Sequence, residues 1–108
     1  RRRKIAERYN EQISTVQTPY VAENVKHVFH QYTIRTDRRE SLAEHLQQKG
    51  IGHGVYYPIP VHRLPSFEAN VDLPETELAA LEVLSIPVHP SLTDEDVDEV
   101  IEVLNSWT

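Results

Sequence analysis

The chain of 108 residues has no cysteine and no methionine and carries a formal net charge of −6. Its length fits one domain with one core, and the lack of cysteine excludes disulfides and thiolate chemistry. All eleven basic residues precede Leu64, whereas the segment from Leu64 onward holds eleven acidic residues and no basic one, which argues against nucleic acid as a partner. No apolar run approaches the roughly 18 residues of a membrane span, so we expect a cytoplasmic protein without a membrane partner.

The N-terminal segment predicts a helix that starts before the chain does. Lys4 to Ile13 has helical spacing, with Ile5, Tyr9 and Ile13 on one face. Four cations, Arg1 to Lys4, would occupy its first turn, where the helix dipole favours anions, and no capping residue precedes them. We therefore expect residues 1–14 to be the end of a longer helix and the chain to be a fragment.

The segment from His27 to Thr36 predicts a strand, because β-branched and aromatic residues alternate along it. Its two faces would each carry four side chains: Val28, His30, Tyr32 and Ile34 on one, and Phe29, Gln31, Thr33 and Arg35 on the other.

A helix and a short strand are expected next. Asp37 and Glu40 have the spacing of a capping box, with Asp37 as the cap of a helix that carries two core leucines and ends at Gly50. The leucines are Leu42 and Leu46. His53 to Tyr57 predicts a short strand that ends at Pro58.

Two further helices are expected in the C-terminal half. Pro74 is tolerated near the start of the first, which would carry Leu78, Leu81 and Leu84 and run into an extended piece, Ser85 to His89. Thr93 caps the second, whose first turn is acidic and whose apolar stripe comprises Val97, Val100, Ile101 and Leu104. Together the elements predict an α/β or α+β domain, a small mixed sheet of about three strands covered by helices.

The stretch GIGHGVYYPIPVHRLPSF, Gly50 to Phe67, is the strongest candidate for a binding element. Its prolines stiffen a loop that presents Tyr56, Tyr57 and His62, which suit a polar ligand such as a sugar or a phosphate. A proline-rich connector whose tyrosines pack on the core remains the alternative.

Other chemistry finds little support in the sequence. Six histidines lack the spacing of a three- or four-ligand metal set, and no serine lies in a nucleophile elbow. The glycines follow a helix rather than open one, as a phosphate loop would require. Lys4, Lys26 and Lys49 lie in polar settings that do not suit a Schiff-base lysine. The chain by itself therefore lacks catalytic residues, a metal site and a cofactor site.

Three stretches together resemble the C-terminal part of the DegT/DnrJ/StrS family of nucleotide-sugar aminotransferases. They are HVFHQYTIR (His27 to Arg35), the Gly50 to Phe67 stretch, and LPETELAALEVLSIPVHPSLTDEDVDEVIEVL (Leu73 to Leu104). The resemblance implies the small C-terminal domain of a type I aminotransferase fold, residues 1–108, in a homodimeric parent enzyme. It also implies pyridoxal 5'-phosphate on a lysine of the parent's larger domain, an amino-acid donor such as glutamate, and a nucleotide-linked keto sugar as acceptor.

The resemblance also assigns the binding loop to the nucleotide-sugar pocket. Tyr56, Tyr57 and Pro58 correspond to a family motif that often reads His-Tyr-Pro, so Tyr56 departs from the commoner residue. Tyr57 and His62 match the family pattern and are expected to contact substrate. His30 also matches a recurring position, where packing or a hydrogen bond is expected rather than ligand contact. A lysine-less regulatory relative, a dehydratase relative and a free-standing interaction module remain alternatives.

Overall fold

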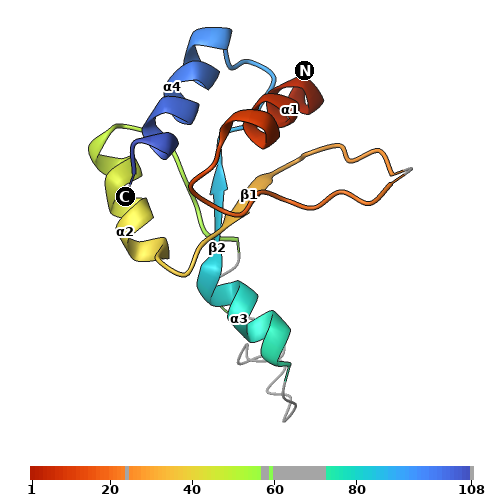
Figure 1. Cartoon of the computed structure of the whole chain (residues 1–108), viewed down its shortest axis with the longest axis vertical. Coiled ribbons are helices and arrows are strands. Elements are labelled where there is room, and N and C mark those ends of the chain that lie inside the picture. Colours follow the sequence, from red (N-terminus) through yellow and green to blue (C-terminus); the bar gives the residue numbers. More distant parts are fainter. Residues whose placement is uncertain (24, 57–58, 60–72, 108) are drawn as a thin grey trace.

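The computed structural model describes residues 1–23, 25–56, 59 and 73–107 (Figure 1). Within these residues, four helices and two strands follow one another as α1 (Arg2–Gln12), β1 (Tyr32–Arg35), α2 (Arg39–Gln48), α3 (Pro74–Glu82), β2 (Val83–Ile86) and α4 (Asp94–Asn105). This order confirms a mixed α/β domain. No helix of the described part is long and apolar enough to span a bilayer.

Among the described residues the sheet has two antiparallel strands, where about three were expected. Tyr32 pairs with Ile86 and Ile34 with Leu84, so these four buried side chains share one face of the sheet. Single antiparallel bridges extend each edge, from Gln17 to Arg35 and from Gly54 to Ser85. The predicted strand from His53 to Tyr57 is thus one bridge at Gly54, and Tyr57 lies outside the described residues.

Three helices gather around one half of the sheet, while α3 projects away from them at the other end (Figure 1). In this half, α1 packs against α4, and α2 packs against β2. The core that they enclose joins the buried face of the sheet to the apolar stripes of the helices: Ile5, Tyr9, Leu42, Leu46, Val97, Val100, Ile101 and Leu104. The predicted core faces of these three helices are therefore confirmed.

The buried Tyr9 side chain of α1 links three parts of the chain. Its ring packs edge-on against Tyr32 of β1, with ring centroids 4.9 Å apart, and its hydroxyl donates a 2.6 Å hydrogen bond to the Pro87 carbonyl oxygen. The Tyr32 hydroxyl donates in turn to Asn10 Oδ1 at 2.5 Å. Burial raises the pKa of both phenols well above the ordinary value, so both stay protonated as donors.

The strand predicted from His27 to Thr36 is confirmed for Tyr32–Arg35 and is wrong for the residues before them. Phe29 has a φ of 50°, a left-handed conformation that a regular strand cannot contain. The strand therefore begins only after Phe29. The imidazole of His27 stacks on the Phe29 ring at 4.1 Å, and its Nδ1 accepts a hydrogen bond from the Phe29 N–H. Phe29 is consequently buried, whereas Val28 is 72% exposed.

The start of α2 differs from the prediction and its end agrees with it. The N-cap is Arg38 and makes no side-chain cap hydrogen bond, so the capping box expected from Asp37 is wrong. The Thr36 hydroxyl oxygen instead accepts a hydrogen bond from the Arg38 N–H. Gly50 has a φ of 74° just beyond the helix, which is the left-handed stop that its position predicted.

The helix that begins at Pro74 is shorter than expected. It ends at Glu82, and the next residues form β2, so Leu84 is a buried strand residue rather than a helical one. Leu78 and Leu81 are exposed, at 46% and 66%, which contradicts the expected apolar face. The early turn into β2 brings Glu82 within 2.6 Å of the Arg35 guanidinium across the sheet.

The α4 N-terminus forms the capping box that the sequence predicted at Thr93. The Thr93 hydroxyl accepts from the Asp96 N–H at 3.1 Å, and the Asp96 carboxylate accepts from the Thr93 N–H at 2.9 Å. The hydrogen bond from the Thr93 N–H to the Asp96 carboxylate is the largest cause of a lowered Asp96 pKa.

We predict that Thr93→Ala destabilises the protein by about 1 kcal/mol, because an alanine at the N-cap leaves the Asp96 N–H without its side-chain acceptor. Urea unfolding followed by circular dichroism measures the difference. Thr93→Ser keeps the hydroxyl and should stay near the parent value; equal losses in both variants would contradict the capping explanation.

We also predict that Tyr9→Phe lowers the free energy of unfolding by about 1–3 kcal/mol, because the Pro87 carbonyl loses its donor in a largely dry setting. Tyr20→Phe is the matched control, since Tyr20 is 86% exposed. Equal unfolding midpoints for the two variants would show that the hydroxyl of Tyr9 contributes nothing.

Candidate functional site

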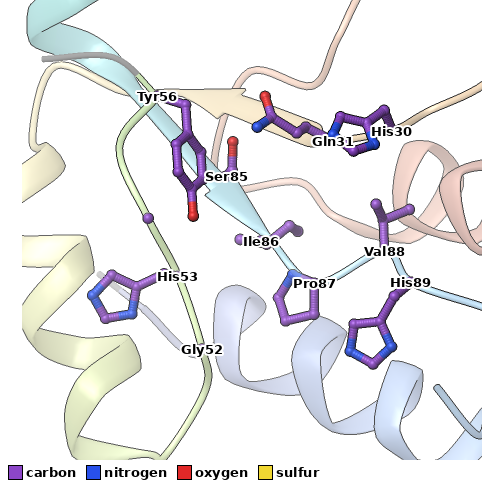
Figure 2. A pocket seen from close by; sticks show the side chains of 11 residues that line it. His30, Gln31, Gly52, His53, Tyr56, Ser85, Ile86, Pro87, Val88 and His89 are labelled. Carbon is purple, nitrogen blue, oxygen red and sulfur yellow. The ribbon is translucent and has the colours of Figure 1, made fainter. Parts of the chain in front are cut away.

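A depression of about 420 Å³ lies where three segments meet. The first segment leads into β1, the second is the loop that follows α2, and the third is the end of β2 with the residues after it (Figure 2). The lining residues are His30, Gln31, Gly52, His53, Gly54, Tyr56, Ser85, Ile86, Pro87, Val88 and His89. Its position follows from the antiparallel register, which places the beginning of β1 beside the end of β2.

The loop after α2 is fixed to the edge of β2 by backbone hydrogen bonds. Ser85 donates its N–H to the Gly54 carbonyl at 2.7 Å, and Gly54 donates to the Ser85 carbonyl at 3.1 Å. Two residues later the Tyr56 ring folds back over Gly54, close to the strand (Figure 2). Tyr56 is 48% exposed, so part of its aromatic surface stays open to a ligand.

Three histidines line the depression from its three sides (Figure 2). The Nδ1 of His53 lies 3.1 Å from the Ile51 carbonyl oxygen, which can only accept, so Nδ1 is the donor of this hydrogen bond. The Nδ1 of His89 lies 2.7 Å from the Ser91 hydroxyl. His30 is exposed, which argues against the packing role considered for it and leaves the hydrogen bond as a prediction. The depression thus offers imidazole, phenol and amide groups above an apolar floor of Ile86, Pro87 and Val88.

The side chains of the described residues that surround the depression are groups suited to binding a polar ligand. Lys4, Lys26 and Lys49 are exposed and do not line the depression. Within the same ranges, no three His, Asp or Glu side chains come together as a possible metal site.

Only one of the three predicted site residues can be placed. Tyr56 lines the depression, whereas Tyr57 and His62 lie outside the described residues. Sequence reasoning missed His53 and His89, which meet at the depression only because Gly54 pairs with Ser85. A usable signal was the Pro87 to Pro90 segment, since residues just beyond a strand end often line a ligand site.

Comparisons with known proteins agree on one family. The family model described as the DegT/DnrJ/EryC1/StrS aminotransferase family matches residues 1–105. A pleiotropic regulatory protein of Geobacillus stearothermophilus is 44% identical over 81% of this chain and 24% of its own length. The dTDP-3-amino-3,4,6-trideoxy-alpha-D-glucose transaminase of Streptomyces venezuelae is 36% identical over 82% of this chain and 24% of its own length.

A solved structure gives the same result for the fold. The crystal structure of DesV of S. venezuelae, in complex with a ketimine intermediate, superposes with a TM-score of 0.93 and 34% identity. The match covers 99% of this chain and 31% of DesV. The chain therefore spans about a quarter to a third of the proteins that it matches, and it belongs to the DegT/DnrJ/EryC1/StrS aminotransferase family.

Proposed function

We propose that this chain is the C-terminal domain of a pyridoxal-phosphate-dependent aminotransferase that acts on nucleotide-linked keto sugars. The enzyme would transfer an amino group from an amino acid, glutamate in the expected case, to the keto group of the sugar. The observation that carries the proposal is the match of residues 1–105 to an aminotransferase family, together with the transaminase relative at 36% identity. The ketimine in DesV fits this chemistry, since an amine and a ketone condense to a ketimine.

In this proposal the chain supplies a wall for the substrate. The depression holds aromatic and polar side chains on segments fixed by the sheet, which suits recognition and positioning. Tyr56 would contact the substrate directly, and Tyr57 and His62 would contact it from the same loop. The domain would also help to keep water out, which favours transfer of the amine over hydrolysis.

The cofactor and the catalytic lysine would belong to the rest of the enzyme. Pyridoxal phosphate supplies an electron sink when bound, but the exposed lysines of this chain do not suit its attachment. We further propose a homodimeric, cytoplasmic parent, and inactivity of the chain when it is isolated.

A regulatory role is the second candidate. It is favoured by the 44% identity to a protein named as a pleiotropic regulator. The reading frame upstream of the Arg1 codon separates the candidates: a longer frame with a cofactor lysine supports the enzyme, and the same frame without that lysine supports a regulator or a dehydratase. A start codon at Arg1 would leave a free-standing interaction module.

We predict that Tyr57→Phe and His62→Ala each raise KM for the nucleotide sugar about five- to tenfold in the full enzyme, as expected for one lost hydrogen bond of about 1 kcal/mol or slightly more. Steady-state kinetics measures KM, and the absorbance of the bound cofactor reports its occupancy. We expect both variants to bind the cofactor fully. Loss of cofactor from either variant would show that the loop contacts the cofactor and not the nucleotide sugar.

For the isolated chain we predict no covalent pyridoxal phosphate. The protein is mixed with the cofactor, reduced with borohydride and analysed by mass spectrometry after digestion. A stoichiometric adduct at Lys4, Lys26 or Lys49 would contradict the assignment of the cofactor lysine to another domain. Sparse labelling spread over all three exposed lysines is the expected background.

A further inference from the structure

We propose that Gly54 is a positioning residue for Tyr56: the missing side chain of Gly54 lets the phenol lie against the backbone beside β2, where its open surface receives the flat face of a ligand ring. This inference rests on the proposed function for the identity of the ligand. The ring is either that of the nucleobase, which has a flat π face, or that of the sugar, which presents an apolar face of C–H groups, and either face packs on an aromatic side chain.

The first support is the space around Gly54. A Cβ atom placed on it would lie 2.8 Å from the Tyr56 hydroxyl oxygen and 2.9 Å from the ring atoms Cε2 and Cζ. Real Cβ atoms do not come so close to other heavy atoms, so an alanine at this position must displace the phenol. The backbone does not itself demand glycine, because the left-handed glycine among the described residues is Gly50.

The second support is that Gly54 cannot easily move away from the phenol. Its N–H and its carbonyl are both hydrogen-bonded to the backbone of Ser85, which is buried in β2. The Ser85 hydroxyl is in turn hydrogen-bonded to the Thr33 hydroxyl of β1, with 3.0 Å between the two oxygens. A shift of the loop would break two backbone hydrogen bonds, each worth about 1 kcal/mol. The half-exposed Tyr56 side chain is therefore the part that yields.

The third support is where the phenol lies. Tyr56 lines the depression together with Ile86, Pro87 and His89, and its hydroxyl end points along the loop toward Gly52 and His53 (Figure 2). A displaced phenol would alter the wall of the depression without adding or removing a polar group. The expected consequence is weaker ligand binding at unchanged chemistry, which is the effect of a positioning residue.

Gly52 provides a matched control in the same loop. It lines the same depression, but a Cβ atom on it would meet nothing within 4 Å. Gly52→Ala and Gly54→Ala therefore make the same chemical change two residues apart, and only the second is expected to disturb Tyr56.

The test compares Gly54→Ala, Gly52→Ala, Tyr56→Ala and the Gly54→Ala/Tyr56→Ala double variant in the full enzyme. We expect Gly54→Ala to raise KM for the nucleotide sugar about as much as Tyr56→Ala, with kcat nearly unchanged and with no further loss in the double variant, because both changes remove one contact. Gly52→Ala places a methyl group in the same lining without meeting Tyr56, so it should change KM less than Gly54→Ala does. Additive losses, or a parent-like KM for Gly54→Ala, would overturn the inference.

Two further measurements separate this inference from the proposed function. In nuclear magnetic resonance spectra, the Tyr56 ring signals should move in Gly54→Ala and stay in Gly52→Ala; unmoved signals in Gly54→Ala overturn the inference whether or not the enzyme transfers an amine. Inhibition by the free nucleoside diphosphate identifies the ring: weakened inhibition in Gly54→Ala indicates the nucleobase, and unchanged inhibition with a raised KM indicates the sugar. If the parent enzyme, without any substitution, transfers no amino group to a nucleotide sugar, the proposed function is refuted and the positioning role of Gly54 is not.

Discussion

The hydrogen bond from the Tyr9 hydroxyl to the Pro87 carbonyl is the contact on which the rest of the structure depends. It joins the first helix to the segment that follows the last strand, 78 positions later, while the Tyr9 ring packs on Tyr32 of the other strand. The Tyr9 side chain is fully buried and the bond itself is part-buried, so its loss would remove a donor from the Pro87 carbonyl in a partly desolvated setting. Pro87 also lines the floor of the depression, so the bond that holds α1 to the segment after β2 also fixes that floor.

The candidate site is a consequence of sheet register rather than of any local motif. Pairing Tyr32 with Ile86 places the residues before β1 next to those after β2, and the bridge from Gly54 to Ser85 adds the loop after α2 as a third wall. A register shift of one residue would turn the buried face outward, so the packing of Tyr32, Ile34 and Leu84 specifies the site as well as the core.

Sequence patterns predicted features set by neighbours along the chain and missed those set by distant contacts. The capping box at Thr93 and the left-handed Gly50 each depend on a few adjacent residues, and both were found. The conformation of Phe29 depends on burial of its ring beside Tyr32, at 5.9 Å between centroids, which overrides the strand propensity of its neighbours. His53 and His89 are 36 positions apart, and no spacing rule connects residues brought together by one bridge.

The geometry explains how one domain can occur in both transaminases and regulatory relatives. The depression depends on backbone hydrogen bonds, a glycine and aromatic side chains, and its described lining holds no amine that could attack a carbonyl. Under the proposed function, such a surface would bind a ring and orient it and would leave bond-making to groups elsewhere. In the proposed enzyme, loss of the cofactor lysine from another domain would therefore abolish amino transfer and leave this surface unchanged.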